Sequence, residues 1–144
     1  MKMEYLVGLI LSLAVVAAAA IIGFDRERSF YSTVLIVVAT YYVLFAVMGA
    51  SERTLIIEIV VASGFFLFAV LGFKGNLWLV AAAMVGHGIF DFIRPRFIEN
   101  PGVPHWWPGF CLTFDVIFGG WLALRLLQRT NFPHHSGAMG RHAG

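Results

Sequence analysis

Apolar residues occur along this chain in five long segments, which short polar stretches separate. The segments cover residues 5–24, 30–49, 54–73, 77–93 and 109–127. A helix needs about 17 to 25 apolar residues to cross the hydrocarbon core of a bilayer, so each segment is long enough to span it. The first three breaks are the short sequences DRERS, ASER and KGN. Because such short turns join helices of opposite direction, the pattern predicts an all-α bundle of five antiparallel transmembrane helices.

The first segment has a second interpretation, as a secretory signal peptide that would be removed. Lys2 precedes an apolar stretch that ends in AVVAAAA, but apolar residues continue beyond the alanines to Phe24. That length is typical of a membrane span rather than of a signal core, so we expect five helices, and four only if the first is lost. Residues 1–129 then form one transmembrane domain. Residues 130–144 have no hydrophobic periodicity, and we expect a disordered tail there.

The composition supports a membrane setting. Hydrophobic residues make up 60% of the chain and charged residues 12%, whereas a soluble domain has about half and a quarter. The net charge is +2 and the basic residues are scattered, so no nucleic-acid surface is predicted. On five spans, six Lys and Arg fall on the side of the C-terminus and four on the other side. The positive-inside rule therefore favours a cytoplasmic C-terminus.

Four ionisable side chains fall inside the predicted spans: Glu58, His87, Asp91 and Asp115. An acid at the centre of a membrane helix costs about 2.5 to 3.5 kcal/mol, so such residues are rarely incidental. The third predicted helix begins, the fourth ends and the fifth begins on one side of the membrane. The four groups then share one leaflet, and we expect them to face one another as a candidate acid–base set.

The fourth predicted helix concentrates polar residues on one face. His87, Asp91 and Arg94 lie at positions i, i+4 and i+7, which places them along one line. Gly86 and Gly88 flank the histidine and leave room for a neighbouring helix or a ligand. Arg94 is the expected counter-ion of Asp91 or of the glutamate on the third helix, and it is also suited to hold a ligand head group.

The long fourth break, RPRFIENPGVPHWWPGFC, contains four prolines that prevent a helix and restrict its path, so we expect it to cover the polar leaflet. Trp106 and Trp107 have two interpretations: anchors at the membrane–water interface, or side chains that close a pocket. Asn100 precedes a proline and is expected to form an Asx turn. Cys111, the single cysteine, lies one turn before Asp115. The candidate ligand-binding residues are Arg94, Asn100, Trp106, Trp107 and Cys111.

Three strings carry a resemblance: DRERSFYSTVLIVVATYYVLFAVMG, HGIFDFI and NPGVPHWWPGFCLTFDV. They resemble a group of small uncharacterised bacterial polytopic membrane proteins with the pattern HGxFD, then NPGVPxWWPxFC, then Asp. The likeness covers about residues 25 to 120. It implies a multi-pass protein of the bacterial inner membrane and no activity. In that group the position of Arg94 is often histidine, so the resemblance carries no metal role over to Arg94.

Three classes of function remain open from the sequence. The first is an enzyme or binding pocket for a lipid-like or small amphipathic ligand, although HExxH and GxSxG motifs are absent from the chain. The second is a proton-coupled transporter, although the predicted polar set stops at one leaflet. The third is a structural or partner-binding subunit with a buried ion-pair lock, and a homo-oligomer is compatible with it.

A metal site is not predicted from the sequence. Glu58, His87, Asp91, Cys111 and Asp115 offer donors for zinc or iron, but only one histidine lies within the predicted spans. Strong metal motifs pair histidines or cysteines, and a second axial histidine for haem is missing as well. No cofactor is therefore expected.

Overall fold

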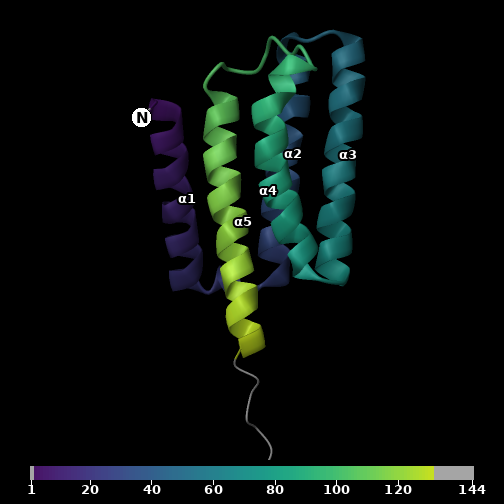
Figure 1. Ribbon diagram of the computed structural model, residues 1–144. Coiled ribbons are helices and arrows are strands. Elements are labelled where there is room, and N and C mark those ends of the chain that lie inside the picture. Colours follow the sequence, from purple (N-terminus) through teal and green to yellow (C-terminus); the bar gives the residue numbers. More distant parts are fainter. Residues whose placement is uncertain (1, 132–144) are drawn as a thin grey trace, which may run out of the picture.

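A computed structural model describes residues 2–131, which form five α-helices, two short 3-10 helices and no strand (Figure 1). The elements are α1 (Met3–Ile22), η1 (Phe24–Arg26), α2 (Arg28–Gly49), α3 (Glu52–Lys74), α4 (Leu77–Ile93), η2 (Arg94–Arg96) and α5 (Trp107–Asn131). The predicted all-α class is confirmed. Thr130 and Asn131 belong to α5 rather than to the predicted tail, and the rest of that tail lies outside the described residues.

The short connections have identifiable causes in the sequence. Gly23 ends α1 with φ of 93°, in the left-handed region that glycine adopts without strain. The Ser51 hydroxyl accepts a hydrogen bond from the Thr54 backbone N–H at 3.2 Å, which caps the start of α3. Asn76 Oδ1 accepts one from the Trp78 backbone N–H at 3.0 Å, which caps the start of α4. These caps satisfy backbone groups that would otherwise be unpaired at the helix starts.

The five helices lie side by side, and their connections alternate between the two ends of the bundle (Figure 1). α5 packs against α1 and α4, α3 packs against α2 and α4, and α1 packs on α5 rather than on α2. α3 and α5 consequently lie on opposite sides of α4. The loop at residues 97–106 closes the end of the bundle at which α3 begins, α4 ends and α5 begins (Figure 1).

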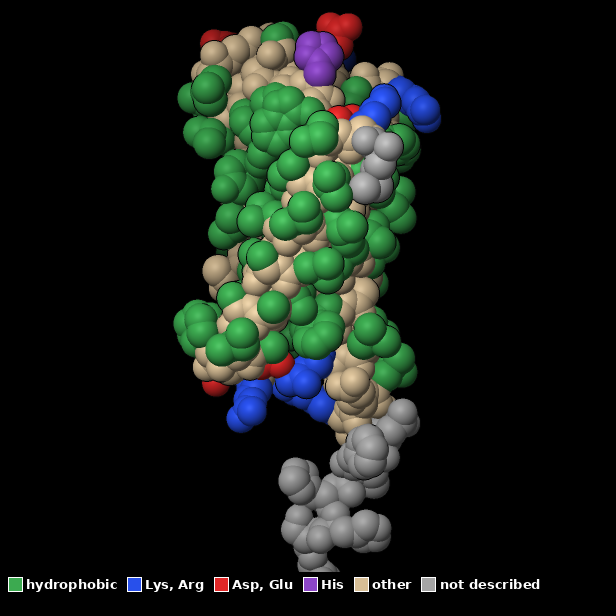
Figure 2. All heavy atoms as spheres, turned by 90° about the vertical axis from the view of Figure 1, so that its left-hand side faces the viewer, with side chains coloured by type: hydrophobic (Ala, Val, Ile, Leu, Met, Phe, Trp, Pro, Cys, Tyr) green, Lys and Arg blue, Asp and Glu red, His purple; other side chains and the backbone are tan. Residues whose placement is uncertain are grey.

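The outer surface of the bundle is apolar over its middle. Each of the five helices is long and apolar enough to cross a membrane by length and composition. Large side chains such as Ile21, Met48 and Val60 are 86%, 70% and 66% exposed. Figure 2 shows apolar side chains across the middle of one face and charged side chains at its two ends. Because a surface helix of a soluble protein turns a polar face outward, this surface is consistent with a multi-pass membrane protein.

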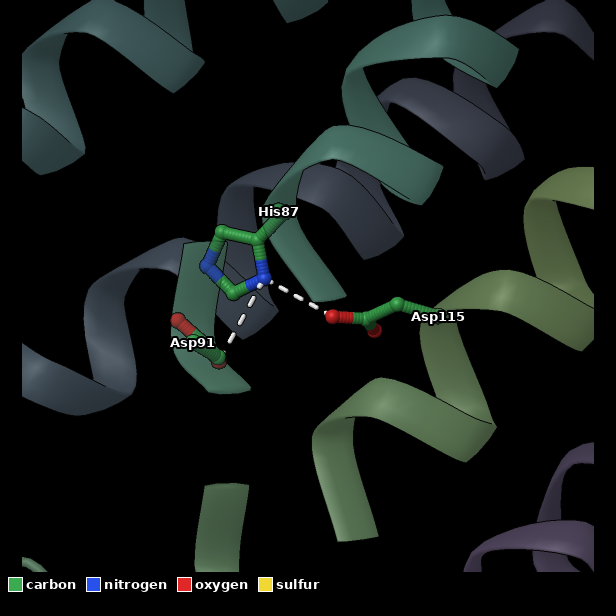
Figure 3. Close-up of side chains that lie close together, drawn as sticks. All are labelled: His87, Asp91 and Asp115. Carbon is green, nitrogen blue, oxygen red and sulfur yellow. Dashed lines mark hydrogen bonds and ion pairs between the residues drawn. The ribbon is translucent and has the colours of Figure 1, made fainter. Parts of the chain in front are cut away.

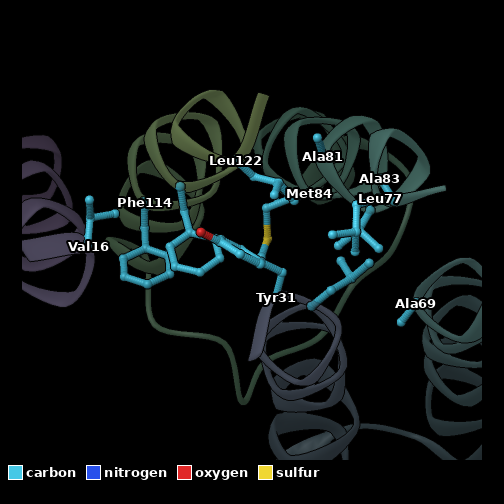
Figure 4. Packing of buried hydrophobic residues seen from close by; sticks show 12 residues of the cluster. Val16, Tyr31, Ala69, Leu77, Ala81, Ala83, Met84, Phe114 and Leu122 are labelled. Carbon is cyan, nitrogen blue, oxygen red and sulfur yellow. The ribbon is translucent and has the colours of Figure 1, made fainter. Parts of the chain in front are cut away.

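The apolar core takes residues from all five helices, and Figure 4 shows how they pack. Val16 of α1, Tyr31 of α2 and Ala69 of α3 meet α4 and α5 there. On α5, the rings of Phe114 and Phe118 stack with centroids 5.9 Å apart. The core extends along α4 to Met84 and along α5 to Phe114, where it meets the buried polar cluster described next.

Candidate functional site

His87, Asp91 and Asp115 form one buried cluster between α4 and α5 (Figure 3). Their exposed fractions are 2%, 0% and 0%. His87 Nδ1 lies 2.8 Å from Oδ2 of Asp115, within hydrogen-bond distance, and 3.6 Å from Oδ2 of Asp91, beyond it. The structure thus brings the polar face of α4 against the acid of α5, as the shared depth of these residues in the sequence predicted.

A close approach of the two helices makes this contact possible. A Cβ atom added at Gly88 would lie 2.9 Å from the Asp115 Cβ and 3.3 Å from the Cys111 carbonyl oxygen. A larger residue would therefore hold α5 away from α4 and lengthen the bond between His87 and Asp115. A Cβ at Gly86 meets no atom within 4 Å, so the packing role expected of both glycines applies to Gly88.

Three carboxylate oxygens of the cluster receive no hydrogen bond from the described chain. They are both oxygens of Asp91 and Oδ1 of Asp115. The Tyr42 and Cys111 side chains are near neighbours of Asp91, but neither forms an aligned hydrogen bond with it. Buried polar groups are nearly always paired, and a buried charge is costly without a partner. The cluster thus has spare capacity to accept a proton, a water molecule or a cation.

Glu58, the fourth candidate of the acid–base set, lies outside this cluster. It forms an ion pair with Arg94 instead, and the two side chains are only 1% and 2% exposed. The physical reason is geometric: α3, which carries Glu58, lies across α4 from α5, which carries Asp115. The sequence predicted either Asp91 or Glu58 as the partner of Arg94, and the structure pairs Arg94 with Glu58.

Asn100 ties the covering loop to this ion pair. Its Nδ2 donates to Glu58 Oε1 at 3.1 Å and to the Tyr42 carbonyl at 3.2 Å. Its Oδ1 accepts from the Gly102 backbone N–H at 3.3 Å, which is the predicted Asx turn. One side chain therefore shapes the loop and attaches it to α2 and α3, next to the ion pair of Glu58 and Arg94.

Tyr42 is a site residue that the sequence did not predict. The Arg94 guanidinium carbon lies 3.9 Å from the centroid of its ring, a cation–π distance. The same ring lies 6.5 Å from the His87 ring, so Tyr42 separates the ion pair from the cluster. A tyrosine in the middle of an apolar span was the available signal, because its hydroxyl needs a polar neighbour.

An apolar groove of about 840 Å³ runs between α1, α2 and α5 and reaches the buried cluster. Its walls are mostly apolar side chains, such as Leu11 of α1 and Val34 of α2. Asp115 and Cys111 also line it, so the acid that binds His87 forms part of the groove wall. The groove therefore joins a long apolar surface to a buried polar group.

The two tryptophans lie where the groove meets the covering loop. Trp107 packs edge-on against Tyr41 and Phe45, with ring centroids 5.1 and 5.0 Å away. Trp106 is 49% exposed, and both tryptophans line the groove. The position of Trp107 suits closure of the pocket, and the exposure of Trp106 suits an interface anchor.

A second ion pair lies at the opposite end of the bundle. Asp25 of η1, which is buried, pairs with Arg125 of α5, which is 30% exposed. The Tyr31 hydroxyl donates to the Asp25 carbonyl at 3.1 Å. The sequence predicts only a turn in this segment, because the contact joins residues 100 positions apart. The pair connects the first loop to α5 and does not reach the cluster.

Comparison of the chain with protein-family models, with curated proteins and with solved structures gives no match.

Proposed function

We propose that this chain is a five-helix antiparallel protein of the bacterial inner membrane, with its C-terminus in the cytoplasm, that binds one lipid-like amphipathic molecule. The proposed binding site is the groove between α1, α2 and α5. The observation that carries the proposal is that this apolar groove has Asp115, the hydrogen-bond partner of His87, in its wall. A molecule with a hydrocarbon chain and one polar group matches both parts of the surface.

The dimensions of the groove suit a hydrocarbon chain. α2 lines it from Ser29 to Tyr41, which corresponds to about 18 Å of helix at 1.5 Å per residue. This is shorter than the hydrocarbon core of about 30 Å, so a bound chain would remain within the membrane. The volume of about 840 Å³ is within the range of about 300 to 1,000 Å³ that is usual for small-molecule sites.

The polar end of the ligand is proposed to lie beside Asp115 and Cys111. Both side chains are buried, so a hydroxyl, amine or acid placed there is shielded from bulk water. Imidazole is the side chain best suited to exchange a proton near neutral pH, and the bond to Asp115 orients the ring of His87. The pair can therefore give a proton to the ligand or take one from it, which supports an acid–base role.

Filling the groove tests the proposal. Val34→Trp places a large ring in the groove, and Val60→Trp is its matched control, because Val60 is exposed on α3 outside the groove. The proteins are purified in a mild detergent, incubated with a photoreactive phosphatidylglycerol and digested, and the crosslinked peptides are identified by mass spectrometry. We expect crosslinks on groove residues of the wild type and of Val60→Trp, and a several-fold loss in Val34→Trp. Equal labelling of all three proteins would contradict the proposal.

A further inference from the structure

We propose that His87, Asp91 and Asp115 together bind one divalent transition-metal ion of the Zn²⁺ class. Each side chain offers one ligand atom, and these atoms lie within 4.8 Å of one another. The site stands on this cluster alone and does not require a ligand in the groove. While an ion is bound, His87 Nδ1 and Asp115 hold the ion and do not exchange the proton proposed above. The sequence did not predict this site because the donors come from two helices and include a single histidine.

Two of the three donor separations, those from His87, are close to those of a tetrahedral site. The third, between the two carboxylates, is within 4.8 Å, so the carboxylates would approach each other when an ion binds. With metal–ligand bonds of about 2.0 to 2.1 Å, two ligands of a tetrahedral ion lie about 3.3 to 3.4 Å apart. The distances from His87 Nδ1 to Oδ2 of Asp115 and to Oδ2 of Asp91 are 2.8 and 3.6 Å. Both pairs therefore reach the required separation through shifts of a few tenths of an ångström to about half an ångström. In Figure 3 the two carboxylates approach the same ring nitrogen from different helices.

The unpartnered oxygens of Asp91 point to a cation rather than to a structural hydrogen-bond network. Asp91 is 0% exposed, and neither of its carboxylate oxygens accepts an aligned hydrogen bond within the described chain, although the Tyr42 hydroxyl and the Cys111 thiol are its neighbours. The nearest arginine, Arg94, is engaged by Glu58. A protonated His87 would offset only one of the two carboxylates, whereas a divalent ion offsets both and leaves the imidazole neutral, as a ligand must be.

The donor set selects the class of metal. Imidazole nitrogen with carboxylate oxygens suits first-row transition ions, whereas Mg²⁺ and Ca²⁺ prefer sites made only of oxygen. The Cys111 thiol is buried beside Asp91, but it does not belong to the group of donor atoms that lie within 4.8 Å of one another. Because Cys111 and Asp115 line the groove, an ion held by this cluster would lie next to the polar end of a molecule bound there.

The test needs a chain in which other histidines do not bind metal. His105, His134, His135 and His142 are therefore replaced by alanine in the full-length chain, which leaves His87 as the only histidine. Binding of Zn²⁺ to the purified protein in detergent is measured by isothermal titration calorimetry and by the shift in melting temperature. We expect one saturable Zn²⁺ per chain and a higher melting temperature. Absence of saturable binding would overturn the proposal.

Asp91→Asn is the informative variant, and Asp25→Asn is its matched control. Both remove one buried carboxylate, but Asp25 pairs with Arg125 at the other end of the bundle. We expect Asp91→Asn to lose at least tenfold in Zn²⁺ affinity and Asp25→Asn to bind as the parent does. Equal affinity of the two variants would show adventitious binding and overturn the proposal.

A measurement on the parent protein keeps the proposal testable if Asp91→Asn fails to fold. X-ray absorption by the Zn²⁺-loaded chain should show one imidazole together with oxygen ligands at about 2.0 to 2.2 Å. Because His87 is the only histidine in this background, a spectrum without imidazole scattering would place the ion elsewhere and refute the assignment.

Discussion

Glu58→Ala is expected to destabilise the folded bundle by about 3 to 5 kcal/mol, the usual cost of removing one partner of a buried ion pair. The variant leaves the guanidinium of Arg94, which is only 2% exposed, without its carboxylate. It also removes the acceptor of the Asn100 side-chain amide, a contribution of about 1 kcal/mol that lies within the same range. The Tyr42 ring still faces Arg94, but a cation–π contact is worth only about 0.5 to 2 kcal/mol.

The second ion pair provides an internal comparison. Asp25→Ala removes the partner of Arg125, whose side chain is 30% exposed and can reach water or lipid head groups. Its loss should cost about 1 kcal/mol, closer to the value of a surface pair. The double variant Glu58→Met with Arg94→Met replaces both charges by apolar side chains. Its free energy of unfolding should lie within about 1 kcal/mol of the wild-type value.

The free energies of unfolding can be measured by titrating detergent-solubilised protein with SDS, with helical circular dichroism as the signal. We expect a large loss of unfolding free energy for Glu58→Ala, a small loss for Asp25→Ala and strong coupling between Glu58 and Arg94. The single variants Glu58→Met and Arg94→Met complete the double-mutant cycle. A loss below about 1 kcal/mol for Glu58→Ala, or a double Met variant as unstable as the sum of these two singles, would refute the buried lock.

Two further predictions concern packing and topology. Gly88→Ala should lower the free energy of unfolding by about 1 to 3 kcal/mol in the same assay, because its Cβ would lie 2.9 Å from the Asp115 Cβ. Gly86→Ala, which has open space around its Cβ, should be neutral or stabilising. Equal effects of the two variants would contradict the close contact between α4 and α5. Single cysteines at Met3 and Thr130, in a Cys111→Ser background, should react with a membrane-impermeant maleimide from opposite sides of the membrane. Labelling of both positions from one side would indicate four spans.

Much of this architecture follows from the sequence by local rules. Five apolar segments predicted five helices, and the predicted bounds of the fourth, residues 77–93, match those of α4. The spacing of His87, Asp91 and Arg94 predicted one polar face, because the helical period is a local property of the backbone. The shared depth of His87 and Asp115 in their helices predicted that they could meet, and they lie 2.8 Å apart.

The identity of each partner was decided by the tertiary structure. Glu58 has the same depth as the cluster, yet it pairs with Arg94 because α3 and α5 lie on opposite sides of α4. The contact of Tyr42 with Arg94 and the groove that reaches Asp115 likewise depend on which helices are neighbours.

When every face of a helix is apolar, the spacing of its apolar residues does not predict which other helices it packs against. In a bilayer, lipid is as apolar as the core, so hydrophobicity does not specify which face of a helix turns inward. Close packing decides it instead, as at Gly88, where the missing side chain lets α5 approach α4. The sequence therefore determined the helices and their polar faces, and packing between helices determined which polar groups share a site.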